Sequence, residues 1–275
     1  MAAPAIAGKQ WLELPGEEGN QEHVLTAVAG TERNFSYNYD EDMYSSMWVA
    51  YPLYAAITAN NGYSASWKSD PSISTDRQIN IWKSSYGVNL GSTDSQGYDS
   101  SVEFYARGHQ IPNADRRGNE TMQSQTYYAT NSTPQIQSGF NAGIWETLES
   151  DIRSELSSID TIYVATGPAF CKMGETRAVT WILPQNETIR TCPVPNYYWK
   201  VLLKVKRDSG GNVTSASTVG FWFEHKSYTG SSYSEYAVSV DQIEQWTGFD
   251  FFVNLPDSIE TSAETSASWS AFQNF

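Results

Sequence analysis

The chain has few of the features that define several common protein classes. Its 275 residues include only two cysteines and three histidines, which are too few for a disulfide framework or a cysteine-rich metal site. No run of about 18 consecutive apolar residues occurs, so we expect no segment to cross a membrane. Lysine and arginine together number 17 against 31 acidic residues. This shortage of positive charge argues at first against a nucleic-acid partner, because phosphate backbones attract basic side chains.

The negative charge is concentrated at the two ends of the sequence. Of the formal net charge of -14, residues 1–60 contribute -6 and residues 235–275 contribute -7, the latter from seven acidic residues and no basic ones. Residues 172–207, in contrast, carry seven basic and two acidic residues. This stretch leaves room for a polyanion site, or it forms an ordinary solvated strand surface.

Apolar and aromatic residues are plentiful enough for a large core. They make up 40% and 14% of the chain, which excludes a disordered or fibrous protein. We expect a loosely packed lead-in over residues 1–31 and a single domain over residues 32–275. Runs rich in β-branched and aromatic residues predict strands at 48–53, 161–166, 178–183, 197–205 and 218–223. Residues 60–101 are rich in Ser, Gly, Asn and Asp and are expected to form long loops.

Two helices are predicted among these strands. In residues 139–158 the apolar residues recur at helical spacing and form one stripe; they are Phe140, Ile144, Leu148, Ile152, Leu156 and Ile159. A shorter helix is predicted over residues 240–247, where Ser239 and Gln242 suit a capping box and Gly248 a stop signal. Because strands dominate and do not alternate regularly with helices, the predicted fold class is α+β.

The segment from Tyr105 to Arg116 carries the strongest chemical signal. His109 follows Gly108, which lets the backbone bend, and Arg107 lies two positions before the histidine. Histidine is the side chain suited to take a proton near neutral pH. Taken alone, the segment is also explained by a turn histidine that bonds a nearby carbonyl group.

Polar residues recur along the first predicted helix, where Asn141, Glu149 and Arg153 follow one another with Trp145 between them. On a helix, Glu149 and Arg153 would lie about 80° and 120° around the axis from Asn141, beside the apolar stripe. The amide oxygen of Asn141 is a hard ligand of the kind that Mg²⁺ accepts. Alternatively, Asn141 is an N-terminal cap and Glu149 and Arg153 form a helix-stabilising pair.

Together these segments resemble the DNA/RNA non-specific endonuclease family, the ββα-metal nucleases. The family's Asp-Arg-Gly-His signature is matched by residues 106–109, and its Thr-Asn-x-x-Pro-Gln signature by residues 130–135. Its metal-helix pattern is matched in order by Asn141, Trp145, Glu149 and Arg153. The resemblance covers roughly residues 45–256, and residues 221–225 are most similar to members from Bacteroides-type bacteria.

The resemblance implies a ββα-metal (His-Me finger) fold with a mostly antiparallel central sheet flanked by helices. It also implies an endonuclease that hydrolyses phosphodiester bonds of DNA and RNA with Mg²⁺, or with Mn²⁺ in its place. In this family the histidine is the general base, so His109 would take a proton from the attacking water and Asn141 would bind the metal ion. Contacts to the phosphate backbone predict little sequence preference.

The resemblance assigns supporting roles to four further residues. Asn131 would orient the ring of His109 or hold the motif loop, and Glu149 would position metal-bound water. Arg107 and Arg153 would contact phosphate oxygens.

Two departures from the family pattern predict low activity or an altered substrate. Ala106 stands where the signature has Asp, and the stretch 61–71 contains no arginine, only Lys68, with Arg77 at another spacing. The alternative function is therefore a catalytically weakened nuclease fold at the cell surface that binds glycans or nucleic acid. Ten Trp and 17 Tyr residues among Ser- and Asn-rich loops could stack on sugar rings.

Three further expectations concern context. The composition favours export, so the mature protein would be secreted, periplasmic or at the surface of a bacterium, as a monomer or homodimer. Cys171 and Cys192 would form a disulfide or remain two buried thiols. His225 ends an apolar strand and is expected to be structural.

Overall fold

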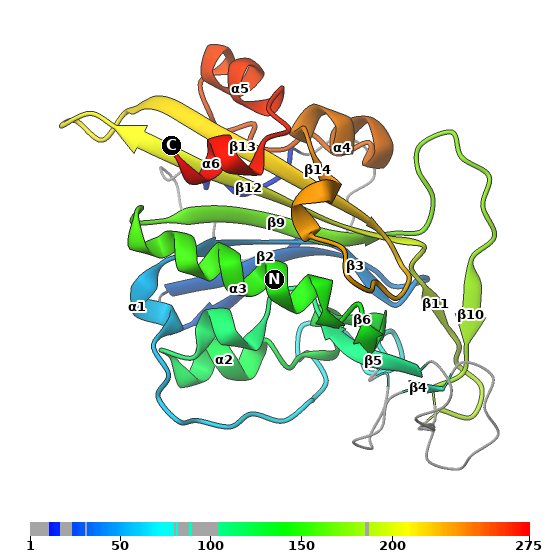
Figure 1. The fold of residues 1–275 in the computed structure, drawn as a ribbon. Helices are drawn as coiled ribbons and strands as arrows, with labels where there is room; N and C mark the ends of the chain where they lie inside the picture. The colour runs from blue at the N-terminus through cyan, green and yellow to red at the C-terminus, as the bar shows by residue number, and fades with distance from the viewer. Residues whose placement is uncertain are drawn as a thin grey trace.

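A seven-stranded antiparallel sheet organises the molecule (Figure 1). The computed structural model describes residues 11–16, 24–30, 32–79, 81, 88–89, 104–184 and 187–275, with the backbone alone for 24–28, 88–89 and 104. In spatial order the strands are β1 (Val24–Ala29), β2 (Glu32–Asp40), β3 (Ser45–Leu53), β9 (Ile162–Ala169), β12 (Tyr197–Arg207), β13 (Val213–Glu224) and β14 (Ala237–Val238).

Smaller pairings and helices surround this sheet. The other strands are β4 (Val88–Asn89), β5 (Phe104–His109), β6 (Ser132–Ile136), β7 (Ser138–Gly139), β8 (Ala142–Gly143), β10 (Thr180–Ile182) and β11 (Cys192–Val194). The α-helices are α1 (Ala55–Thr58), α2 (Glu120–Gln125), α3 (Ile144–Ser154), α4 (Val240–Thr247), α5 (Asp257–Glu264) and α6 (Trp269–Gln273). Short 3-10 turns are η1 (Asn113–Arg116), η2 (Ala129–Asn131), η3 (Glu155–Ser157) and η4 (Tyr233–Tyr236).

The central strand β12 separates two cores, because successive side chains of a strand point to opposite faces. Tyr198 and Leu202 belong to the core under α3, α6 and the β5–β6 hairpin. Trp199, Val201 and Leu203 belong to the second core, which residues from α4 and from 249–255 complete. The sheet is thus covered on both faces, and the α3 face carries the hairpin with the predicted histidine motif.

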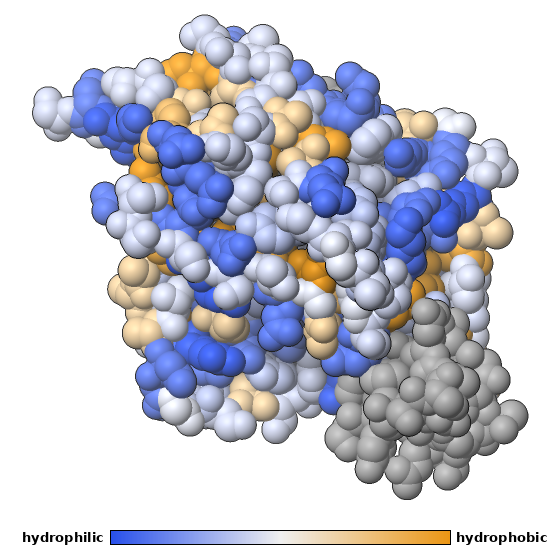
Figure 2. Space-filling model, viewed as in Figure 1, coloured by the Kyte–Doolittle hydropathy of each residue, from blue (hydrophilic) through white to orange (hydrophobic). Residues whose placement is uncertain are grey.

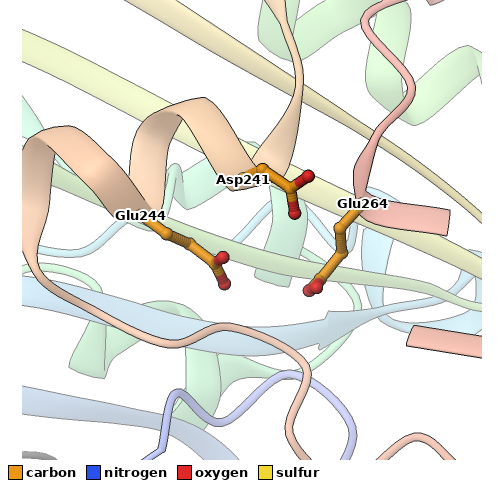
Figure 3. A group of neighbouring side chains, drawn as sticks. All are labelled: Asp241, Glu244 and Glu264. Atoms are coloured by element: carbon orange, nitrogen blue, oxygen red, sulfur yellow. The ribbon is translucent and has the colours of Figure 1, made fainter. Parts of the chain in front are cut away.

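Helices α4 and α5 bring acidic residues together on the second face of the sheet. Figure 3 shows the side chains of Asp241 and Glu244, from α4, pointing toward that of Glu264, the last residue of α5. Thr218 of β13 donates a hydrogen bond to the carbonyl of Ala263 at 2.7 Å, which fixes the end of α5 on the sheet.

The predicted strands are confirmed, most of them with longer extents. The run at 48–53 lies within β3, 161–166 within the start of β9 (except Thr161), 197–205 within β12 and 218–223 within β13; only the run at 178–183 is shorter in the structure, as β10. Within 60–101, the described residues 60–79 form loops apart from one isolated bridge at Lys68, whereas Val88 and Asn89 form the short strand β4, which pairs with β5. Residues 80, 82–87 and 90–101 lie outside the described residues. The α+β class is therefore confirmed.

The first helix begins later than its apolar spacing predicts. It starts at Ile144, not near residue 139, so Asn141 and Phe140 lie in the turn before it. Gly139 has a φ of 78°, and the parallel pairing of β7 with β8 closes this turn before helical bonding begins. Phe140 is nevertheless fully buried, which explains why it fits the stripe. The second helix is confirmed as α4, with Ser239 as N-cap and Gly248 in the left-handed conformation.

The described parts of the segment 1–31 pack against the sheet. β1 pairs with β2 along its length, Leu12 is buried in the second core, and Glu13 forms a buried ion pair with Arg33. Figure 2 shows hydrophilic residues spread over the visible face with small, separated apolar patches. None of the helices in the described part of the chain has the length and apolar character needed to span a membrane. Cys171 and Cys192 are free thiols.

Candidate functional site

The β5–β6 hairpin holds the histidine motif. His109 is the last residue of β5 and pairs with Ser132, and Gly108 pairs with Thr133. A Cβ atom added at Gly108 would lie 2.1 Å from Cδ of Gln135, whose side chain lies across the glycine. The glycine of one signature therefore makes room for the glutamine of the other, and any side chain at position 108 would have to displace the buried side chain of Gln135.

The buried side chain of Asn131 fixes the loop that follows His109. Its Oδ1 accepts from the backbone N–H of Ile111 at 3.0 Å, and its Nδ2 donates to the carbonyls of Ile111 and Thr126 at 3.0 and 2.8 Å. Its own carbonyl accepts from the N–H of Gln110. All of these bonds join Asn131 to the main chain of the loop, and none of them reaches the ring of His109. The amide acts on His109 through the main chain.

Two aromatic rings enclose the imidazole of His109. The ring centroids of Trp67 and Tyr127 lie 4.6 and 5.0 Å from that of His109. Nε2 of His109 is buried and has no hydrogen-bond partner among the described residues. Burial, with a smaller contribution from Arg107, lowers the pKa of His109 to about 3. The ring is therefore neutral near pH 7, with a free nitrogen that can accept a proton.

Positive charge lies beside this imidazole. The guanidinium of Arg107 packs over the ring of Trp67 at 4.8 Å, and burial lowers its pKa to about 10, so it stays charged. Burial raises the pKa of Tyr127, and Arg117 and Arg107 both oppose that rise. The side chain of Arg117 therefore lies close to the ring of Tyr127, which packs on the imidazole of His109. Sequence spacing gave no reason to select Arg117, because it follows the signature and the family pattern places its other arginine before it.

The turn before α3 holds Asn141 with its amide oriented. Nδ2 of Asn141 donates to Oε1 of Gln137 at 2.9 Å, and its backbone N–H donates to the carbonyl of Ile136. Because the NH₂ group is engaged, Oδ1 is the atom left to accept, and it makes no hydrogen bond with any described residue. Asn141 does not cap the helix; Gly143 occupies the N-cap position.

Glu149 and Arg153, on α3, belong to a buried network of charges. Arg153 donates to Asp115 at 2.9 Å, and the hydroxyl of Tyr51 donates to the other oxygen of Asp115 at 3.0 Å. Burial raises the pKa of Glu149 to about 7, while Lys200 and Arg153 favour its charged form. Lys200 is 1% exposed and lies over the ring of Trp145 at 4.6 Å.

The predicted site residues thus form neighbouring groups around one ββα unit. Arg107 and His109 lie together with Trp67 and Tyr127, and Glu149 and Arg153 lie together with Asp115 and Lys200. Asn141 sits in the turn between β6 and α3, which joins the two groups along the chain. Direct contacts of His109 with Asn141 or Glu149 do not occur among the described side chains, so the groups are linked by the backbone of the unit.

Sequence reasoning missed four residues in these groups. Trp67 and Lys200 come from distant segments whose approach depends on the fold, and Tyr127 has the common appearance of a core aromatic. Asp115 lies within the inspected segment, but only the structure reveals its buried partners Arg153 and Tyr51. Alternation along β12 is the one signal that places Lys200 on the α3 face.

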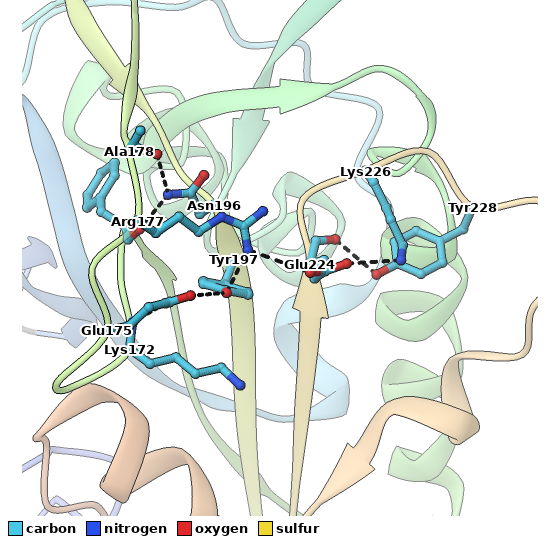
Figure 4. A network of polar contacts seen from close by, with 10 residues as sticks. Lys172, Glu175, Arg177, Ala178, Asn196, Tyr197, Glu224, Lys226 and Tyr228 are labelled. Carbon is cyan, nitrogen blue, oxygen red and sulfur yellow. Dashed lines mark hydrogen bonds and ion pairs between the residues drawn. The ribbon is translucent and has the colours of Figure 1, made fainter.

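The basic stretch at 172–207 does not form an open polyanion surface. Arg177 donates to the hydroxyl of Tyr197 at 2.6 Å and lies 3.6 Å from the carboxylate of Glu224 (Figure 4). Lys204 is buried and bonded to Glu155 at 2.8 Å, and Arg190 pairs with Glu187. Acidic neighbours or burial therefore neutralise several of these charges, while Lys206 and Arg207 at the end of β12 are exposed.

The departures from the family pattern have local explanations. Ala106 is 4% exposed and belongs to the apolar core of the α3 face, where its methyl group packs without an unpaired charge. Lys68 turns away to bond Ser124, and Arg77 lies beside Glu41 and Asp42. Both side chains thus interact with residues outside the groups described above.

Comparison with protein families matches the sequence model of the DNA/RNA non-specific endonucleases over residues 16–258. The nuclease of Serratia marcescens is 29% identical over 221 residues, which are 79% of this chain and 72% of that protein. Mitochondrial endonuclease G of Caenorhabditis elegans is 28% identical over 174 residues, which are 60% of this chain and 53% of that protein.

A solved structure has the same fold. The crystal structure of the EndoG/EndoGI complex contains a chain that superposes with a TM-score of 0.65 at 21% identity, covering 85% of this chain and 88% of that chain. The ββα unit made by β5, β6 and α3 and the mostly antiparallel central sheet confirm the predicted architecture. With the family match extending over most of its length, the chain belongs to the DNA/RNA non-specific endonuclease family.

Proposed function

We propose that the chain is a Mg²⁺-dependent endonuclease that hydrolyses phosphodiester bonds of DNA and RNA, with His109 as general base and Asn141 as metal ligand. The observation that carries the proposal is the buried, unpartnered Nε2 of His109, held between Trp67 and Tyr127 with Arg107 beside it. A neutral imidazole with a free nitrogen is the form that a general base requires.

The residues around Asn141 fit a hard divalent cation. Gln137 holds the amide so that Oδ1 remains the accepting atom, and an amide oxygen suits Mg²⁺, which keeps most of its water ligands. When bound, the ion supplies Lewis-acid stabilisation of charge on the phosphate and on the leaving oxygen. Mn²⁺ prefers a similar oxygen-rich set and would replace it.

The other residues act on substrate and on one another. Arg107 would bind a phosphate oxygen close to the water that His109 deprotonates, and Arg117 would offer a second positive charge near the same ring. Glu149 would accept hydrogen bonds from water in the site. Arg153 is bonded to the buried Asp115, which supports a positioning role for it beside Glu149 in place of a direct phosphate contact.

The decisive experiment is cleavage of plasmid DNA and of RNA with MgCl₂. The wild type should cut both, and His109→Ala should lose at least about 100-fold in rate, the usual contribution of general-base catalysis. The matched control is His225→Asn, since His225 lies outside the groups described above; its soluble fraction should keep wild-type cleavage. Equal cleavage by His109→Ala and the wild type would refute the assignment of the base.

The metal assignment has its own test. Asn141→Ala should abolish Mg²⁺-dependent turnover, whereas Asn212→Ala, which alters an exposed turn amide, should leave it unchanged. Wild-type cleavage that persists in excess EDTA, or full activity of Asn141→Ala, would contradict the proposal. If neither nucleic acid is cut, glycan binding becomes the function to examine.

A further inference from the structure

The acidic C-terminal stretch gathers in one place on the face of the sheet opposite α3. Of its seven acidic residues, only Glu235 lies apart; the others come from α4, α5 and the residues between them. Glu264 is the most buried of the set, with 4% of its surface exposed. Burial of a carboxylate is costly unless a partner compensates its charge.

Three of these carboxylates converge. Asp241 and Glu244 lie one turn apart on α4, and Glu264 extends from the end of α5 into the space between them (Figure 3). One oxygen from each residue lies within 4.8 Å of the others. Oε1 of Glu264 is buried and has no hydrogen-bond partner among the described residues. The Glu264 carboxylate thus faces two other carboxylates, and one of its oxygens is buried with no donor opposite it among the described residues.

The surroundings add negative charge and no compensating base. Burial raises the pKa of Glu264 to about 9, and the neighbours that raise it further are all carboxylates, led by Glu244 and Glu260. The pKa of Glu244 rises to about 7 for the same two reasons, although Phe251 donates its backbone N–H to one of its oxygens at 2.8 Å. A proton or a cation at this position would offset the gathered negative charge.

We propose that Asp241, Glu244 and Glu264 bind a Ca²⁺ ion that holds α4 and α5 together, independently of the nuclease site. All three residues offer carboxylate oxygens, with no histidine or thiolate among them, which favours a hard cation over zinc. Ca²⁺ tolerates variable geometry and takes six to eight oxygen ligands, whereas Mg²⁺ demands near-ideal octahedral geometry. Carboxylates from two separate helices suit the larger ion.

The ion would be a structural element with no part in hydrolysis. The three ligands lie on the second core's side of the sheet, whereas His109 and α3 lie on the first. Binding to the folded state alone would raise stability by mass action. With calcium at roughly 100 times its Kd, the Tm should rise by about 5–10 °C.

The test is calorimetric titration of the metal-free full-length protein with CaCl₂, together with thermal unfolding. To remove the proposed catalytic metal site, both are done in an Asn141→Ala background. We expect one bound Ca²⁺ and the Tm increase in that background. Glu264→Gln and Asp241→Asn should each abolish the increase, because each replaces a carboxylate ligand by a neutral amide.

The matched control is Glu235→Gln, which removes one charge from the same acidic stretch but outside the cluster. It should keep the full calcium response. The proposal is overturned if calcium leaves the Tm of the Asn141→Ala protein unchanged, if the cluster variants respond like the control, or if MgCl₂ at equal concentration stabilises as much as CaCl₂. None of these readouts depends on nuclease activity.

Discussion

At the scale of single residues, Gly108 and Gln135 link the two signature segments. Each signature is recognisable in the sequence, but the reason for its glycine is visible only where the strands pair and the Gln135 side chain crosses the Cα of Gly108. Since β5 ends at His109, displacement of this strand displaces the proposed base directly.

Gly108→Ala should therefore destabilise the protein by about 1–3 kcal/mol, the usual cost of overpacking a tight core. It should also lower nuclease activity, because the displaced Gln135 side chain must repack beside the strand that ends at His109. Shortening the facing side chain in Gly108→Ala/Gln135→Ala should recover part of the stability. Urea unfolding of the two single variants and the double variant measures the coupling; purely additive free energies would show that the contact does not matter.

His225 illustrates the other use of histidine in this chain. Its Nδ1 donates to the carbonyl of Pro195 and its Nε2 accepts from the N–H of Ile136, both at 2.8 Å, so the ring joins β6 to the segment between β11 and β12. Burial lowers its pKa to about 4. The structural role expected from the sequence is confirmed by these two bonds.

His225→Ala should lower the free energy of unfolding by about 2–4 kcal/mol, since it leaves two buried backbone groups unpaired. The neighbouring exposed variant Lys226→Ala should change it by less than about 0.5 kcal/mol. In the wild type, the unfolded imidazole takes up a proton near pH 6.5 but the folded one only near pH 4. Stability should therefore fall as the pH falls through this window, and the His225 variant should lose that part of the dependence.

At the scale of elements, the sequence predicts whether a segment forms a helix or a strand better than it predicts where that element begins and ends. The strand runs and α4 are located by composition and caps, which act locally. The start of α3 is missed because Phe140 continues the apolar stripe while the β7–β8 turn, a product of backbone pairing, delays the helix. The same holds for the candidate site. Its signature residues can be identified from the sequence, whereas Trp67, Asp115 and Lys200 reach the site only through tertiary contacts.

Strand β12 and helix α3 meet through buried charges as well as apolar residues. Lys204 is fully buried, donates to Glu155 at 2.8 Å and also to the carbonyl of Phe272 at 3.1 Å. Lys204→Met should cost roughly 3 kcal/mol of stability, because it leaves Glu155 without its partner. Lys204→Met/Glu155→Gln should recover much of that loss in denaturant unfolding; an unchanged loss would place the cost in the missing bond to Phe272.

At the scale of the whole molecule, pH should act on stability through the acidic cluster. The folded pKa of Glu264 is about 9 and that of Glu244 about 7, both above their values in an unfolded chain. A raised carboxyl pKa stabilises the fold at low pH, and this contribution is lost as the pH rises through the folded pKa. In EDTA the Tm should therefore fall as the pH rises from about 4.5 to about 9, and Glu264→Gln should flatten the curve.

The net charge of -14 no longer argues against a nucleic-acid substrate once its location is known. The described acidic cluster lies on the α4–α5 face, while the α3 face contains Arg107 and Arg117 beside the proposed base. This separation of the acidic cluster from the arginines is consistent with the family assignment. Export and the monomeric or dimeric state remain predictions, which culture-supernatant immunoblotting and sedimentation would test.

The acidic cluster and the proposed base lie on opposite faces of the sheet, so the two sides of the protein differ in charge. We expect a polyanion to be repelled on the α4–α5 side and attracted at the arginines beside the β5–β6 hairpin, so productive collisions should depend on orientation before any contact forms. The association rate with a nucleic acid should then depend on ionic strength even though the protein is acidic overall. A net negative charge that weakens the binding of a nucleic acid overall can therefore favour its approach in the productive orientation.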